Sequence, residues 1–130
     1  MERIRSKKES SLTKGLGSRG ESWAKVYLMD KGYRILETGF RCALGEVDLI
    51  AEEGGDIVFV EVKTRRNTLF GYPEEQISFS KKKRLGRLAQ WYLQYRLRAE
   101  RSARFDVVSI LTTKEGRVAG VDLIQNAFSP

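Results

Sequence analysis

Two acidic residues and one lysine stand in neighbouring β-rich segments, and their types suit the hydrolysis of a phosphodiester. Asp48 lies in the segment 45–52, whereas Glu61 and Lys63 lie in the segment 56–63. Carboxylate oxygens are the ligands that Mg²⁺ prefers. A nearby ammonium can clamp a phosphate and orient or deprotonate a water molecule. The three side chains could therefore hold a cation and hydrolyse a phosphodiester, provided that the fold brings them together.

The loop between the two segments fixes which way these side chains face. Gly54-Gly55 between two β-rich runs predicts a hairpin with a two-residue turn. In that register Asp48 stands directly opposite Glu61, with Cβ atoms about 5 Å apart. The opposite face is apolar and is expected to enter the core with Val47, Leu49, Ala51, Val58, Val60 and Val62. Because opposed like charges are destabilising, a divalent cation, Mg²⁺ or Mn²⁺, between the acids would explain their placement.

A plainer interpretation stays open for the same residues. Lys63 could neutralise Glu61 or Glu46 in an exposed ion-pair network at the edge of a strand. An acid-x-Lys motif is also short, and a chain of this composition contains about one by chance. The predicted register, rather than the motif, therefore favours the metal site.

The elements that must position these residues follow from periodicity and from turn residues. A first helix is expected to begin at Ser18, where Ser18 and Glu21 have the spacing of a capping box, and to stop at Gly32. A second helix is expected after Ser80, and strands are expected at 33–38, 45–52, 56–63, 105–111 and 118–124. A helix of this length suits a crossover to a parallel strand. We therefore predict an α/β fold of αβββαβ order, with a mixed central sheet flanked by helices, as one domain over residues 15–130 after a flexible basic arm at residues 1–14.

The composition excludes several kinds of site. The chain of 130 residues contains no histidine, which removes Ser-His-Asp sites and His-ligated zinc. Cys42 is the single cysteine, so an intramolecular disulfide and a multi-cysteine metal cluster are excluded. No apolar run approaches the ~20 residues that cross a bilayer, and the N-terminus has no apolar signal region. We expect a cytoplasmic protein with no membrane partner.

The net charge of +7 is concentrated in one part of the chain. Residues 63–104 carry twelve basic and three acidic side chains, whereas residues 15–62 carry five and nine. A local basic surplus is typical of proteins that bind a polyanion. The candidate contacts for nucleic acid are Arg65 and Arg66 after the catalytic lysine candidate, and Lys81, Lys83, Arg84 and Arg87 in the second helix. A solvated amphipathic helix remains the alternative for the second group.

Three motifs in order carry a family resemblance. Gly45-Glu46-Val47-Asp48-Leu49-Ile50-Ala51, Val58-Phe59-Val60-Glu61-Val62-Lys63 and Arg104-Phe105-Asp106-Val107-Val108 resemble the bacterial YraN family. That family is similar to restriction-endonuclease-like and Holliday-junction-resolvase-like nucleases of the PD-(D/E)xK type. The resemblance runs from about residue 17 to about residue 123 and implies a restriction-endonuclease-like core. The PD-(D/E)xK motif has a proline before its first aspartate, whereas in this chain Val47 precedes Asp48.

The resemblance also implies roles for individual residues. Asp48 and Glu61 match the metal-ligand positions, Lys63 matches the catalytic lysine, and the backbone carbonyl of Val62 is an expected further metal contact. Glu21 resembles an accessory acid of resolvase-like members, although the capping box would explain it equally well. Gln76 corresponds to a position where some related nucleases carry a polar residue of the site, and it is a further candidate contact for nucleic acid.

These inferences together predict a nuclease-like protein that hydrolyses DNA, branched or damaged, with Mg²⁺ or Mn²⁺. The alternative is a nucleic-acid-binding module that keeps the fold without turnover. Resolvase-like relatives often act as symmetric dimers, so the resemblance leaves a homodimer open, but the sequence identifies no dimer face.

Overall fold

The computed structural model describes residues 16–66 and 73–130. The predicted basic arm at residues 1–14 lies outside this range. The helical elements are α2 (Leu16–Asp30), the short 3-10 helix η1 (Pro73–Gln76), α3 (Phe79–Trp91) and the π-helix η2 (Tyr92–Leu97). The strands are β1 (Arg34–Cys42), β2 (Gly45–Glu53), β3 (Asp56–Arg65), β4 (Ala103–Thr112) and β5 (Val118–Ile124).

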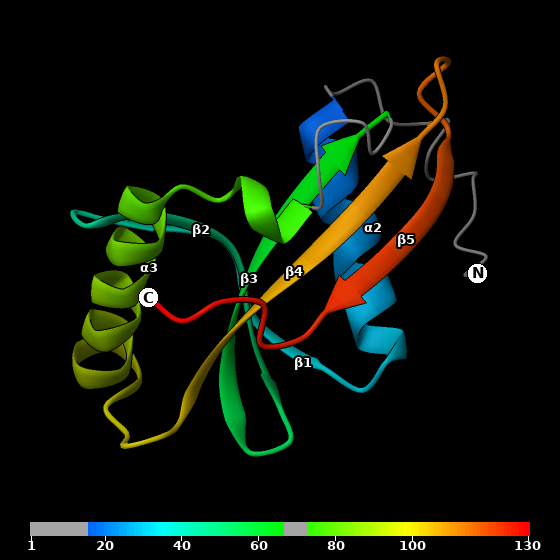
Figure 1. The fold of residues 1–130 in the computed structure, drawn as a ribbon. Coiled ribbons are helices and arrows are strands. Elements are labelled where there is room, and N and C mark those ends of the chain that lie inside the picture. Colours follow the sequence, from blue (N-terminus) through cyan, green and yellow to red (C-terminus); the bar gives the residue numbers. More distant parts are fainter. Residues whose placement is uncertain (1–15, 67–72) are drawn as a thin grey trace.

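The five strands form one mixed sheet in the order β1-β2-β3-β4-β5 (Figure 1). Neighbouring strands are antiparallel except β3 and β4, which are parallel and are connected through η1, α3 and η2. This crossover is the one that the long second helix predicted. The predicted α/β fold of αβββαβ order is confirmed, with β5 added at one edge of the sheet.

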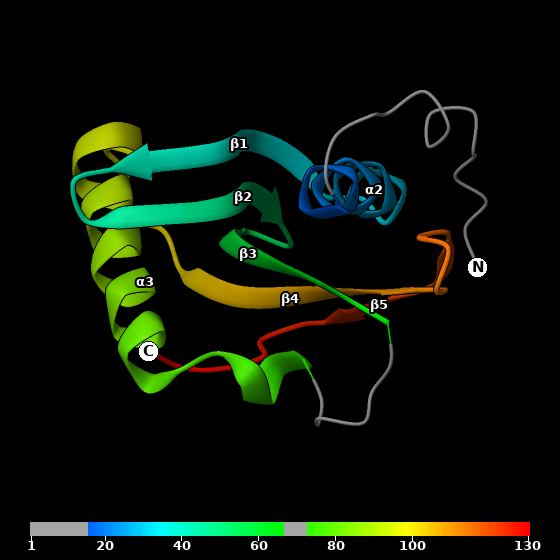
Figure 2. The ribbon, with the colours of Figure 1, turned by 90° about the horizontal axis from the view of Figure 1, so that it is seen from above.

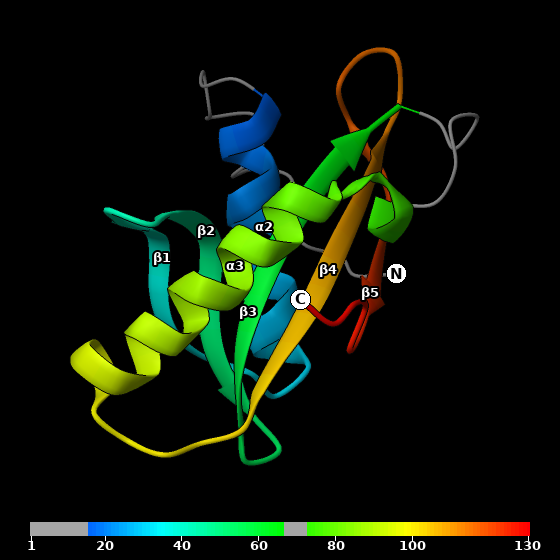
Figure 3. The ribbon, with the colours of Figure 1, turned by 60° about the vertical axis from the view of Figure 1, so that its left-hand side comes forward.

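The two long helices cover opposite faces of the sheet, and Figure 3 shows α3 in front of the strands and α2 behind them. Alternate residues of β3 supply both cores, because successive side chains of a strand point to opposite faces. Phe59 packs with Leu85, Leu88 and Tyr92 on the α3 side, whereas Val60 packs with Trp23 and Leu28 on the α2 side. Both faces of the central strands are therefore buried.

The β2–β3 hairpin has the predicted two-residue turn. Gly54 and Gly55 have φ angles of +59° and +87°, and this pair of left-handed conformations suits a tight hairpin turn. The predicted register is confirmed from Glu53–Asp56 through Leu49–Val60. The prediction that Val47 shares a face with Leu49 is wrong, because Val47 packs with the α3-side core and Leu49 with the α2-side core. Side-chain alternation therefore breaks at Asp48.

Both helices begin earlier than predicted. Helix α2 begins at Leu16, so Ser18 lies inside the helix rather than at its N-cap. Helix α3 begins at Phe79, and its N-cap is Ser78, whose hydroxyl accepts a hydrogen bond from the backbone N–H of Lys81. The predicted stop of the first helix holds, because Gly32, two residues beyond the end of α2, adopts a φ angle of +97°.

The C-terminal segment returns to α3, and Figure 2 shows the C-terminus beside that helix. Phe128 is buried in the α3-side core, where its ring stacks on Phe105. Within residues 16–66 and 73–130, none of the helices is both long enough and apolar enough to span a bilayer.

Candidate active site

Asp48 lies where the hairpin ladder ends. The paired residues of β2 and β3 stop at Leu49–Val60, and beyond this point Asp48 Oδ2 accepts a hydrogen bond from the backbone N–H of Val62 at 2.7 Å. Because the N–H and C=O of one strand residue point to the same side, the carbonyl of Val62 also faces β2. The break in alternation thus places a carboxylate beside a backbone carbonyl.

Glu61 is the buried acid of the site. Its exposed fraction is 3%, and its Oε1 lies 2.7 Å from the Nζ atom of Lys81, which comes from the first turn of α3. Burial, followed by the negative charge of Asp48, raises the pKa of Glu61 above its usual 4.5, while Lys81 and Lys63 act in the opposite direction. Glu61 and Asp48 are therefore close enough to repel each other, as the sequence predicted, although they are not a paired position of the ladder.

Glu21 of α2 joins the same cluster. Its side chain forms a hydrogen bond with Asp48, and its pKa is raised by burial, then by the charge of Asp48, with smaller contributions from Glu46 and Glu61. A hydrogen bond between two carboxyl groups requires a proton on one of them. Since Ser18 lies inside the helix, the capping-box interpretation of Glu21 does not hold, and Glu21 is part of the acid cluster.

Lys63 completes the group at the same end of β3. It is half-buried, and its charge lowers the pKa of Glu61. The structure thus brings together all four residues that the sequence proposed for catalysis, Glu21, Asp48, Glu61 and Lys63. They come from α2, β2 and β3, so the site forms only when the helix packs on the sheet.

The cluster is not a closed cage for a metal ion. Across the two described ranges of the chain, no three acidic or cysteine side chains are arranged to hold a metal ion by themselves. The available donors are the carboxylates of Asp48 and Glu61 and the carbonyl of Val62. One or two carboxylates completed by waters is the usual coordination of Mg²⁺, so this donor set fits Mg²⁺ or Mn²⁺.

The other predicted nucleic-acid contacts lie at the end of β3, in η1 and on α3. Arg65 ends β3 and is half-buried, Arg66 follows it in the exposed turn, and Gln76 is exposed in η1. Lys83, Arg84 and Arg87 are exposed on α3. Lys81, which was also predicted to contact nucleic acid, forms the ion pair with Glu61.

A cleft of about 400 Å³ lies between the β1–β2 turn and the start of α3. It is lined by Arg41, Cys42, Gly45, Glu46, Lys81 and Arg84. Sequence reasoning missed Arg41, because no motif marks it and only the hairpin between β1 and β2 brings it opposite α3. Arg41 pairs with Glu46 at 3.0 Å, and both side chains are largely exposed.

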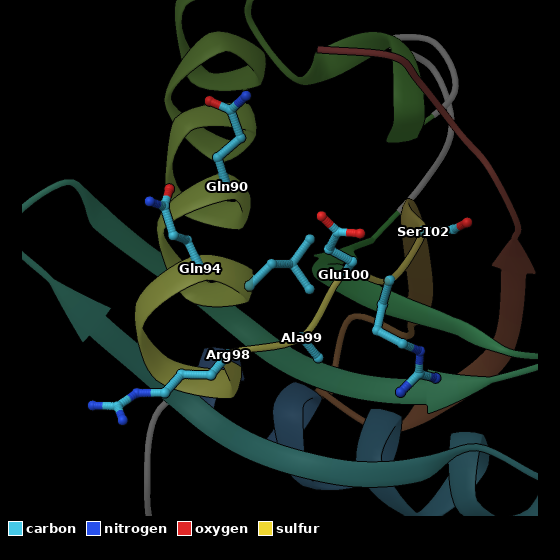
Figure 4. A pocket seen from close by; sticks show the side chains of 8 residues that line it. Gln90, Gln94, Arg98, Ala99, Glu100 and Ser102 are labelled. Carbon is cyan, nitrogen blue, oxygen red and sulfur yellow. The ribbon is translucent and has the colours of Figure 1, made fainter.

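A larger cavity of about 1070 Å³ lies near the other end of α3, where η2 leads into β4 (Figure 4). Its lining includes Gln90, Gln94, Arg98 and Glu100, and none of the predicted site residues. It therefore takes no part in the acid cluster.

Asp106 has a structural role. It is fully buried, accepts hydrogen bonds from Arg104 and from the hydroxyl of Tyr33, and caps the backbone N–H of Asn126. Arg104 also pairs with Glu53 at the hairpin end of the sheet. This network stabilises the end of the sheet that lies away from the catalytic candidates.

Known proteins resemble this chain over most of its length. Residues 20–110 match the model of the "Uncharacterised protein family UPF0102". The UPF0102 protein of Moorella thermoacetica is 50% identical over 112 residues, which cover 86% of this chain and 93% of the relative. That of Caldicellulosiruptor saccharolyticus is 48% identical over 113 residues, which cover 87% and 96%. The chain therefore belongs to family UPF0102, which is the YraN family that the sequence motifs indicated.

Proposed function

We propose that this protein is a metal-dependent nuclease that hydrolyses phosphodiester bonds of DNA. The observation that carries the proposal is the convergence of Glu21, Asp48 and Glu61 beside Lys63, at the point where the β2–β3 ladder ends. Two of these acids, Glu21 and Glu61, have raised pKa values, which means that their charged forms are less stable in the folded protein than in water. Such destabilised charges are typical of functional sites.

A divalent cation would stabilise the negative charges of these acids. Asp48, Glu61 and the carbonyl of Val62 would hold Mg²⁺ or Mn²⁺, and waters would complete the coordination. In the protein without metal, burial and the charge of Asp48 raise the pKa of Glu21 and so favour a proton at this position. When bound, the cation would neutralise charge on the phosphate and lower the pKa of a water.

The remaining residues supply orientation and charge. The ammonium of Lys63 would orient or deprotonate the attacking water, and Glu21 would accept a hydrogen bond from that water or from another water of the site. Arg65 and Arg66 follow the catalytic lysine directly and would steer the substrate. Arg84 and Arg87 lie three residues apart on α3 and would bind the phosphate backbone.

The basic surplus supports DNA as the substrate. The segment 63–104 holds twelve of the 24 basic residues of the chain and follows the acidic hairpin directly. Branched or damaged DNA is the substrate class that the resolvase-like resemblance suggests.

A second function has its own support in the ion pair between Lys81 and Glu61. Because the ammonium already balances the buried carboxylate, a protein that only binds nucleic acid could be stable without a metal. The experiment must therefore separate turnover from binding.

The test is incubation of the wild type and of Lys63→Ala with plasmid, branched and single-stranded DNA in Mg²⁺ or Mn²⁺. Lys25→Ala, an exposed lysine of α2, is the matched control. We expect the wild type and the control to cleave and Lys63→Ala to lose at least about a hundredfold in rate. Equal cleavage by all three proteins would contradict the proposal, and salt-sensitive binding without cleavage would favour the binding module.

A further inference from the structure

The ion pair between Lys81 and Glu61 places a lysine where the proposed cation would bind. Glu61 is 3% exposed, so its charge needs a partner inside the protein. The Nζ atom of Lys81 lies 2.7 Å from Oε1, within strong hydrogen-bond distance. A cation bound to Glu61 and the ammonium of Lys81 would therefore compete for the same carboxylate.

Lys81 also borders the basic cleft on its other side. The cleft contains three basic side chains, Arg41, Lys81 and Arg84, and one acid, Glu46. Arg84 lies against Gly45, and among the described residues no carboxylate lies within ion-pair distance of it. The guanidinium groups are suited to phosphate oxygens. The cleft is thus a suitable place for a backbone phosphate next to the acid cluster.

We propose that Lys81 is a positioning residue that exchanges between two partners: Glu61 in the metal-free protein, and a substrate phosphate in the basic cleft once a divalent cation has bound. This inference rests on the proposed function. The cation would replace the charge of Lys81 at Glu61 and repel the ammonium. The side chain of lysine is long and flexible, and that of Lys81 is about one third exposed, so it can turn towards the cleft.

The exchange predicts that cation binding and DNA binding strengthen each other. A cation that frees Lys81 adds one phosphate contact, and by linkage DNA that holds Lys81 in the cleft leaves Glu61 free for the cation. A static basic patch would show no such coupling through Lys81.

The first measurement is Mn²⁺ binding by isothermal titration calorimetry at pH 8 without DNA. Lys81→Met removes the competitor and should bind Mn²⁺ about tenfold more tightly, which corresponds to about 1.4 kcal/mol. Lys81→Arg should bind Mn²⁺ more weakly than the wild type, because a guanidinium holds a carboxylate through two hydrogen bonds. Lys82→Met is the matched control, since the ammonium of Lys82 lies over the ring of Phe128, 5.5 Å from its centroid.

The second measurement is binding of a short DNA duplex in EDTA and in Ca²⁺, at several salt concentrations. In the wild type, Ca²⁺ should steepen the slope of log Kd against log salt by about 0.9, the value for one added phosphate contact. In Lys81→Met this increase should disappear, whereas in Lys82→Met it should remain.

The results separate this inference from the proposed function. Mn²⁺ affinity that is equal in wild type, Lys81→Met and Lys81→Arg would overturn the exchange while leaving the metal site intact. Absence of Mn²⁺ binding in every protein would overturn both. If Lys81→Met does not fold because Glu61 loses its partner, Lys81→Arg keeps the charge, and unchanged Mn²⁺ affinity in that variant would overturn the exchange.

Discussion

Replacement of Asp48 by asparagine tests the acid cluster most directly, because it removes one charge and nearly no volume. The side-chain oxygen of asparagine can still accept the hydrogen bond from the N–H of Val62, and its amide can donate to Glu21. The variant therefore keeps the local shape and relieves the repulsion among the carboxylates. We expect the sign of its effect on stability to depend on pH.

Two opposing contributions set the magnitude. Two carboxylates in contact have charges about 4 Å apart, and their repulsion amounts to about 4 kcal/mol near a protein surface and about 1 kcal/mol in water; we take about 2 kcal/mol for Asp48 beside Glu21. Loss of the charged acceptor for Val62 N–H costs about 1 kcal/mol. At pH 8 the relief of repulsion should outweigh this loss, so Asp48→Asn should stabilise the metal-free protein by about 1 kcal/mol.

The effect should reverse in acid. The pKa of Glu21 is raised above 4.5 in the folded state, so the folded protein binds more protons than the unfolded chain. The stability due to this group is complete below pH 4.5 and is lost as the pH rises through the folded pKa. At pH 4.5 the raised pKa of Glu21 favours its neutral form and the repulsion is weaker, so the same variant should be less stable than the wild type by about 1 kcal/mol.

The assay is thermal unfolding in EDTA at pH 4.5 and pH 8, with Asp122→Asn, at an exposed position of β5, as the matched control. A difference of about 1 kcal/mol corresponds to a shift in Tm of about 4 °C for a domain of this size. Mg²⁺ should raise the Tm of the wild type and leave that of Asp48→Asn unchanged. Equal destabilisation of the variant at both pH values would refute the reasoning, because Asp48 would then be only a structural hydrogen-bond acceptor.

Two further predictions concern the framework and the basic helix. Arg104→Met leaves the fully buried Asp106 without its ionic partner and should lower the free energy of unfolding in urea by about 3–5 kcal/mol. The exposed control Arg34→Met should cost less than about 1 kcal/mol, and an equally small loss for Arg104→Met would show that Asp106 is stabilised by its other hydrogen bonds. Arg84→Ala combined with Arg87→Ala should reduce the slope of log Kd against log salt for duplex DNA by about 1.8. An unchanged slope would place the DNA interface elsewhere.

Local patterns were sufficient for most of the fold. The Gly54-Gly55 pair determined the hairpin and its register near the turn, because only a left-handed two-residue turn fits between those strands. Alternation in β3 identified Val58 and Val60 as core residues, but it did not show that Ile57 and Phe59 on the other face are buried too, because only the packing of α3 covers that face. The helix starts were less predictable, because Ser18 satisfies the spacing of a capping box while the helix continues through it.

The site was predictable as a set of residue types but not as a geometry. Asp48, Glu61 and Lys63 were identified from one hairpin, whose register follows from nearby residues. The break in the ladder at Asp48 was not predictable. There the carboxylate of Asp48, rather than a backbone carbonyl, accepts the hydrogen bond from the N–H of Val62, and such an exchange produces no periodic pattern in the sequence. Glu21 was ambiguous until the packing of α2 on the sheet brought it to Asp48.

The sequence by itself determined the α/β order, the family and the acids and lysine of the candidate site, because these depend on composition, short-range periodicity and contiguous motifs. Only the tertiary structure decided what each charge faces. It paired Lys81 with the buried Glu61 and set Arg41 across a cleft from Arg84. These contacts join segments far apart in the chain, and their partners are fixed by how α3 crosses the sheet.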